Sequence, residues 1–264
     1  MAKSKKKDEQ KEPGTSVQKV DAAAMILVGD KHDLSHLNAG NRGSEQVGMD
    51  DLVIPRLEIV QSQSPCLDKS DPGYIPGAAI GDLVNSVTNT NYGREVFVVP
   101  VHYTKQWLVW KDRKQGGGFF GAYPNPQEAA DRVEQEGGKE KGVESIDTPT
   151  HLCLLVDTKN GTVDEIIVSM PRTKAKVSRN WNAMIKLTGQ DRFARVYRIA
   201  TAQEKNKRGE TYQNYVIAQS GFPAKALYAR AENLYKQISA GQRNVVMDTK
   251  NYDAGEPAGG DSEM

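Results

Sequence analysis

The alternation of apolar and polar residues predicts that strands dominate the central part of this chain. A long β-branched and aromatic run over residues 94–111 predicts a single strand that bends near Pro100. Two hairpins are expected after it, and the first is marked by Asn160-Gly161 between two apolar runs. The other strands are expected over residues 52–60, 79–87, 151–157, 162–170, 193–201 and 211–219.

Helices are expected where apolar residues recur every three or four positions. Residues 173–188 place Val177 and Trp181 at that spacing, and residues 222–240 form a second amphipathic stretch. Between the long strand and the first hairpin, residues 115–147 are predicted to be a long insertion with an acidic helical patch.

From residue 94 onward the predicted order is long strand, strand, strand, helix, strand, strand. This is the connectivity of an OB-fold. We therefore expect a mainly β fold with helices (α+β): an OB-fold-like antiparallel five-stranded barrel with extra N-terminal strands, a long loop insertion and a C-terminal helix. OB-folds contact nucleic acid through a sheet face and through the loops after the first strand and between the fourth and fifth. A generic α+β domain with an antiparallel sheet is the alternative.

The composition changes at both ends of this region. Residues 1–50 are rich in Lys, Asp, Gly, Ser and Asn and show no sustained period, so we expect a flexible N-terminal tail. Residues 51–243 form the expected folded domain. Residues 244–264 are expected to be a flexible acidic tail, because residues 248–264 hold five acidic residues and one lysine. The 264-residue chain has a net charge of only +1, so the distribution of charge is more informative than its sum.

The chain lacks the features of several protein classes. Cys66 and Cys153 are too few for a zinc ribbon or a disulfide scaffold, and free buried thiols would suit a reducing cytoplasm. No apolar stretch approaches the roughly 18 residues of a membrane helix, and no signal peptide is recognised. Gly116, Gly118 and Gly121 match a dinucleotide-binding pattern, but no helix is expected directly after them. The four histidines are scattered and no acidic ligand cluster accompanies them, so we expect no metal. No Ser/His/Asp grouping stands out and no cofactor motif is accepted, so we expect no enzyme activity and no cofactor.

Basic residues are concentrated between residues 172 and 208. This block holds eleven Lys and Arg residues against two acidic ones, a net charge of +9. Such a block in a nearly neutral chain predicts contacts with phosphates. The alternative is a solvated face that pairs with the acidic patch at 128–147. The candidate nucleic-acid contacts of the block are Lys174, Lys176, Arg179, Arg192, Arg195, Lys205, Lys207 and Arg208.

Aromatic residues lie among basic ones in a second region. Bases stack on aromatic side chains beside basic residues in sequence-neutral single-strand binding, at roughly 1–3 kcal/mol per base. Trp107 and Trp110 are three residues apart, so a regular strand directs them to opposite faces, one as core and one as a platform. Phe119 and Phe120 are expected on a flexible glycine-rich loop, where they stack on bases or fill a gap in the loop. The candidates here are Trp107, Trp110, Lys111, Arg113, Lys114, Phe119 and Phe120, and Trp181 is a further one that is otherwise helix core.

Several motifs over residues 52–220 resemble those of proteins encoded by tailed bacteriophages, and in particular single-stranded DNA-binding proteins of replication and recombination modules. They include Ile54-Pro55-Arg56-Leu57, Gly81-Asp82, Asn85-Ser86-Val87-Thr88 and Ser178-Arg179-Asn180-Trp181-Asn182. The resemblance implies an OB-fold and an acidic C-terminal tail that recruits replication partners. The tail residues in that role would be Asp253, Glu256, Asp261 and Glu263. The chain departs from the common tail at its end, where Met264 stands in place of a terminal Phe.

The basic block, the aromatics and the resemblance together lead to one expectation. The protein would bind single-stranded DNA independently of sequence, in phage DNA replication or recombination, in the cytoplasm of the infected bacterial host. Its partners would be single-stranded DNA and, through the tail, phage or host replication and recombination proteins, with no membrane involved. The alternatives are a phage regulator that binds RNA polymerase and a virion structural protein.

Overall fold

The structure is a computed structural model that describes residues 42–48, 52–158, 161–206 and 209–242. The chain divides into two units at residue 47, and the described helices and strands all belong to the second. The expected N-terminal tail, apart from the exposed turns at 42–48, lies outside the described residues. So do the acidic tail residues and two candidate DNA contacts, Lys207 and Arg208.

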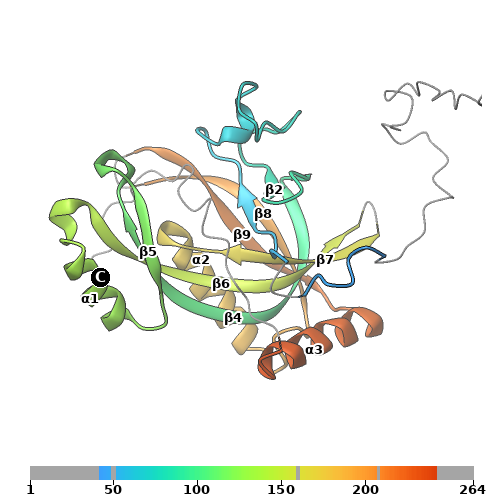
Figure 1. The fold of residues 1–264 in the computed structure, drawn as a ribbon. Helices are drawn as coiled ribbons and strands as arrows, with labels where there is room; N and C mark the ends of the chain where they lie inside the picture. Colours follow the sequence, from blue (N-terminus) through green and yellow to red (C-terminus); the bar gives the residue numbers. More distant parts are fainter. Residues whose placement is uncertain (1–41, 49–51, 159–160, 207–208, 243–264) are drawn as a thin grey trace, which may run out of the picture. The chain divides into compact units, whose positions relative to one another are not determined.

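The described residues of this unit form two antiparallel sheets and three α-helices (Figure 1). The small sheet has the order β1-β2-β3, with β1 Leu57–Ile59, β2 Leu83–Asn85 and β3 Asn91–Gly93. The large sheet has the order β7-β6-β4-β8-β9, and β5 also pairs with β4. Its strands are β4 Glu95–Lys111, β5 Gly118–Tyr123, β6 Val143–Asp157, β7 Thr162–Ser169, β8 Val196–Lys205 and β9 Thr211–Gly221. The helices are α1 Pro126–Gln135, α2 Ala175–Lys186 and α3 Lys225–Ser239.

The mainly β character and the helices agree with the sequence prediction, and β4, β6, β7, α2, β8 and β9 follow the predicted order. Strand β5 stands within the predicted loop insertion, so the large sheet has six strands in place of the expected five. The long strand β4 shifts its register against β6 between Pro100 and His102, where the bend was expected. Strands β6 and β7 pair as an antiparallel hairpin, with Asp157 opposite Thr162, while Asn160 lies outside the described residues.

The expectation of a flexible loop around Phe119 and Phe120 is wrong, because both residues lie in strand β5. The strand contains Gly118 at φ +140° and Gly121 at φ +131°, and its register against β4 shifts between Val109 and Trp110. Its glycines and its irregular register hide the alternation that normally marks a strand. Residues 118–123 nevertheless form a strand, because they pair with the long strand β4 through backbone hydrogen bonds.

Helices cover both faces of the β6–β7 part of the large sheet. On one face, Trp181 and Ile185 of α2 join a core cluster with Val98, Cys153 and Ile166. On the other face, Ala231 and Leu234 of α3 join a second cluster, with Val99, Val101, Leu152, Leu154 and Ile167. Ile166, Ile167 and Val168 of β7 are therefore buried, whereas Thr162 and Asp164 at the start of the strand are exposed, and binding on the sheet face stays a prediction.

The strands of the described ranges form no closed barrel, because no pairing joins β7 to β9. The segment at residues 55–61 occupies the position between them. Ile167 N in β7 donates to Pro55 O at 2.8 Å, and Tyr215 Oη in β9 donates to Leu57 O at 2.7 Å. Gln61 then pairs with the backbone of Gln213, donating through Nε2 at 2.8 Å and accepting through Oε1 at 2.9 Å. A stretch N-terminal to the predicted barrel thus links the two strands that an OB barrel brings together.

None of the helices within the described ranges is long and apolar enough to cross a membrane. The two cysteines are free, with Cys153 buried and Cys66 half-buried. Burial raises the pKa of the Cys153 thiol to about 12, so it stays protonated near neutral pH.

Candidate nucleic-acid interface

Helix α2 begins among positive charges. It follows the 3-10 turn Arg172–Lys174, and its first turn holds Lys176 and no acidic residue. Cations are unfavourable at this end because the N-terminus of the helix dipole is itself positive. The arrangement costs helix stability and concentrates a positive potential where an anion such as a phosphate is stabilised.

The outer face of α2, which we define as Lys176, Arg179 and Lys186, carries three exposed cations. Their spacing of three and seven residues places them on one side of the helix. No carboxylate of the described residues forms an ion pair with any of them. This face is available to a polyanion.

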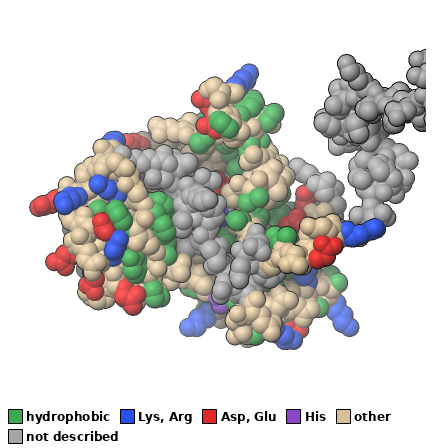
Figure 2. Space-filling view, in the orientation of Figure 1, with side chains coloured by type: hydrophobic (Ala, Val, Ile, Leu, Met, Phe, Trp, Pro, Cys, Tyr) green, Lys and Arg blue, Asp and Glu red, His purple; other side chains and the backbone are tan. Residues whose placement is uncertain are grey.

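The alternative, that the basic block pairs with the acidic patch at 128–147, holds for Arg172, which forms an ion pair with Glu144. The acidic C-cap residue of α1 pairs locally, with Arg132 Nη2 2.6 Å from a Glu136 oxygen. Figure 2 shows acidic and basic side chains mixed over the end of the molecule that carries α1. The patch therefore does not neutralise the outer face of α2.

The other basic candidates are dispersed. Lys205 is exposed at the end of β8. Arg195 is half-buried, with its guanidinium 4.8 Å from the ring centroid of Phe222. Lys174 is also half-buried, and its ammonium lies 5.8 Å from the ring centroid of Tyr215. The net charge of the block therefore does not describe one surface.

The inner side of α2 joins a buried polar cluster around His151, which sequence analysis did not single out. Ser178 Oγ lies 2.8 Å from His151 Nε2, and the His151 ring stacks on Trp181 with centroids 4.4 Å apart. Arg192 Nη2 donates to His151 Nδ1 at 2.6 Å and to Asn182 Oδ1 at 2.9 Å. Since a guanidinium has donors only, Nδ1 is the acceptor, and Nε2–H donates to Ser178.

This proton arrangement decides what the Ser178–His151 pair can do. A serine nucleophile needs a histidine nitrogen that accepts its proton. Here the nitrogen that faces Ser178 already carries one. Burial, and secondly the charge of Arg192, hold the pKa of His151 well below 6.5, so the ring is neutral at physiological pH. The pair therefore serves to hold α2 against β6.

Two predicted DNA contacts belong to this interior. Trp181 has no exposed surface, so it cannot stack on a base, and that prediction is wrong. Arg192 directs its guanidinium hydrogen bonds to His151 and Asn182, so we remove it from the predicted surface. The alternative prediction, that Trp181 belongs to the helix core, is confirmed.

The end of the β4–β5 hairpin carries an aromatic pair in which Phe119 is exposed and Trp110 is half-buried. Trp110 and Phe119 are register partners, with ring centroids 4.6 Å apart, and Phe119 is 38% exposed. Lys111 follows Trp110 in β4, and Lys114 is exposed just beyond it. We call these four residues the arm site. The side chain of Arg113 lies outside what the structure describes.

The other two aromatic candidates pack beneath α1. Trp107 and Phe120 lie against a small cluster that includes Val109 and Ala129. Trp107 packs against this cluster and Trp110 does not belong to it, but both side chains are half-buried, so the assignment of one as core and the other as platform stays a prediction. Phe120 fills a gap between the hairpin and α1, which was one of its two predicted roles.

These features describe a mainly β protein with an exposed basic helix face and an aromatic hairpin end. The chain matches the Pam3 phage gp34-like protein family over residues 25–244 and belongs to that family. It is therefore a bacteriophage protein. Neither the comparison with curated proteins nor the comparison with solved structures finds a match.

Proposed function

We propose that this phage protein binds single-stranded DNA independently of sequence and acts in phage DNA replication or recombination, in the cytoplasm of the infected host. The observation that carries the proposal is the outer face of α2. Lys176, Arg179 and Lys186 are exposed and unpaired within the described residues, and the positive N-terminal end of the helix dipole adds to the potential of Lys176 in the first turn. A surface that retains free cations despite this cost to the helix suits a phosphate backbone.

The arm site supports the proposal independently. A strand-borne pair of aromatic rings flanked by lysines offers stacking surfaces for bases, and stacking tolerates any sequence because every base has a π-face. The order of strands and helix also agrees with an OB-like fold, a common scaffold for single-strand binding. In this proposal the acidic tail recruits phage or host replication and recombination proteins.

A salt-titrated fluorescence assay with poly(dT) tests the proposal. The triple variant Lys176→Gln, Arg179→Gln and Lys186→Gln removes the outer face of α2 and leaves its inner side intact. Each phosphate contact contributes a slope of about −0.7 to the log–log salt dependence, so the variant should flatten the slope by about 2. A matched variant with Lys69→Gln, Lys139→Gln and Lys225→Gln changes the charge equally at exposed positions on other elements.

The outcomes distinguish two hypotheses: that α2 is the binding surface, and that the protein binds single strands at all. An equal slope in the α2 variant and the wild type would exclude α2 as the binding surface. A wild-type protein that does not bind poly(dT) even at low salt would contradict single-strand binding altogether. The regulator and virion alternatives would then be tested by RNA polymerase pull-down and by the protein content of purified particles.

A further inference from the structure

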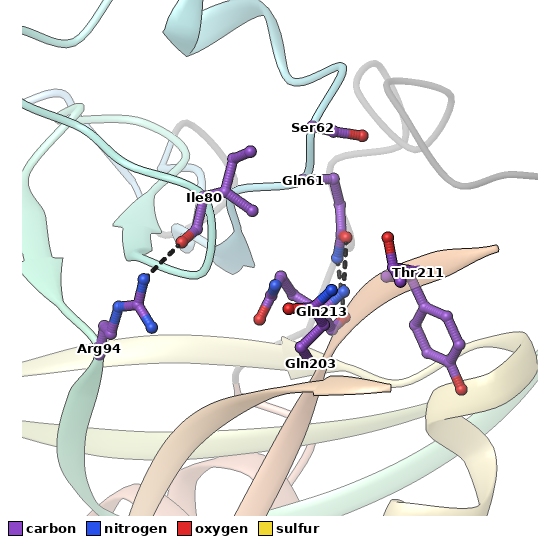
Figure 3. Close-up of a pocket in the computed structure, with 8 residues that line it drawn as sticks. Gln61, Ser62, Ile80, Arg94, Gln203, Thr211 and Gln213 are labelled. Carbon is purple, nitrogen blue, oxygen red and sulfur yellow. Dashed lines mark hydrogen bonds between the residues drawn. The ribbon is translucent and has the colours of Figure 1, made fainter. Parts of the chain in front are cut away.

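A pocket of about 330 Å³ opens between the small N-terminal sheet and the β8–β9 hairpin (Figure 3). Its volume is at the lower end of the roughly 300–1,000 Å³ of small-molecule sites, so it suits a compact ligand. All but one of its lining residues are polar, and none is acidic. They are Gln61, Ser62, Ile80, Arg94, Gln203, Thr211, Tyr212 and Gln213.

Two glutamine side chains supply its hydrogen-bonding groups. Gln203 and Gln213 are register partners on neighbouring strands, so their amides emerge side by side. No side chain or backbone group of the described residues bonds to either side-chain amide. The donors and acceptors that the two amides offer are therefore available to a ligand.

The surrounding chain positions Gln213. Gln61 holds the backbone of Gln213 with two hydrogen bonds, and Gln61 itself is buried. Gly81, at φ +91°, approaches closely: a Cβ built on it would lie 3.2 Å from Gln213 Oε1. A side chain at residue 81 would crowd the Gln213 amide, and glycine leaves it room.

The charge and the apolar surface of the pocket are also suited to a nucleotide. Arg94 is exposed, donates to Ile80 O at 3.1 Å, and forms no ion pair with a carboxylate of the described residues. Its guanidinium can contact a phosphate at the pocket rim. The Ile80 side chain is 43% exposed and offers an apolar contact for one face of a planar ring. Figure 3 shows Arg94, Ile80 and the two glutamines around the same opening.

We infer that this pocket binds a nucleobase, with the amides of Gln203 and Gln213 on the base edge and Arg94 on the adjoining phosphate. A carboxamide pairs one donor and one acceptor with the complementary edge of a base, as Gln does with adenine. The base comes from a bound single strand, in which case the inference rests on the proposed function, or from a free nucleotide. In a strand, the pocket would add a base preference to binding that is otherwise independent of sequence.

Two measurements on the full chain test the inference. The first compares the affinities of dA15, dC15, dT15 and an abasic 15-mer for the wild type and for a Gln203→Ala, Gln213→Ala variant, whose backbone pairing with Gln61 is unchanged. We expect the variant to lose about tenfold in affinity for at least one of the base-bearing strands and nothing for the abasic strand. A Gln219→Ala, Gln237→Ala variant is the matched control, because both residues are exposed glutamines outside the pocket.

The second measurement follows the side-chain amide NMR signals of Gln203 and Gln213, assigned by their loss in the variants, during addition of deoxynucleoside monophosphates. Shifts of these signals support the pocket even if the wild type does not bind strands, and the proposed function would then fail alone. Equal affinities of the variant and the wild type for every strand, together with unshifted amide signals, would overturn the inference.

Discussion

The inner and outer sides of α2 belong to one short helix, but their polar side chains differ in environment: those of the inner side are hydrogen-bonded inside the protein, and those of the outer side are exposed to solvent. Ser178 and Asn182 are engaged in the cluster of His151 and Arg192, where each contact is made within the protein. The outer face presents its cations to solvent without partners among the described residues. A buried charge is retained only where hydrogen bonds offset its desolvation, whereas an exposed charge needs none.

This difference shows why a count of charges is a poor guide to a binding surface. Arg192 and Arg179 contribute equally to the +9 of the basic block. Burial lowers the pKa of Arg192, the expected effect where the charged form has lost water. Arg179 remains exposed. Only Arg179 can contact a phosphate without disturbing the core.

The largest expected effect is on stability, from the inner side of α2. Trp181→Ala should lower the free energy of unfolding by about 3–5 kcal/mol, because it removes a fully buried ring from the core cluster and from the His151 stack. Urea unfolding measures the loss. The α2 triple variant should change stability far less, and a Trp181→Ala variant that unfolds at the wild-type urea midpoint would contradict the comparison.

Strand β5 also has one exposed and one packed aromatic side chain, Phe119 and Phe120, and this difference gives a second prediction. Phe119→Ala should weaken binding to single strands by roughly 1–3 kcal/mol, because it removes an exposed stacking surface, and should barely change the melting temperature. Phe120→Ala should do the reverse, because that ring packs beneath α1. Equilibrium binding and thermal melts of both variants provide the check. Equal losses of binding affinity in Phe119→Ala and Phe120→Ala would contradict the proposed difference between the two rings.

A third, smaller effect is the pH dependence of stability. The pKa of His151 is lowered in the folded protein, so unfolding takes up a proton once the pH falls below about 6.5, the ordinary value. Stability should therefore be full above that pH and decline as the pH falls towards 5, by at most about 1.4 kcal/mol per pH unit. Burial also lowers the pKa of His102, which adds in the same direction. Urea midpoints of the wild type and His151→Gln between pH 5 and 7.5 test this, and identical slopes would contradict it.

The smallest effect concerns the acidic tail and the outer face of α2. Deleting residues 248–264 removes five acids and one lysine, which would otherwise compete with DNA for exposed cations. Affinity for single strands should rise modestly at low salt and hardly at all above physiological salt, where screening acts within roughly 8 Å. An unchanged affinity at low salt would exclude competition between the tail and DNA, and would leave solubility or partner binding as the role of the tail.

The motifs that carry the resemblance to phage proteins prove to be largely structural. Asp82 Oδ2 accepts from Ala79 N at 2.9 Å, and Asn85 Oδ1 accepts from Val87 N at 2.9 Å. Gly81 occupies a left-handed conformation at the wall of the pocket. These residues shape turns that a short polar side chain or glycine stabilises. Their presence indicates the family fold, and the candidate binding residues largely lie elsewhere.

Local pattern was enough to predict most elements of this protein, because strand and helix periods are properties of neighbouring residues. It did not reveal strand β5, the His151 cluster or the pocket. Strand β5 pairs with the nearby strand β4, but its glycines and irregular register hide the alternation. The His151 cluster and the pocket depend on partners distant in the sequence: Gln61 and Gln213 are 152 residues apart, and His151 and Arg192 are 41 apart. Which cations stay free, and which side chains meet around a cavity, is decided by tertiary packing, since only packing determines which groups lose contact with water.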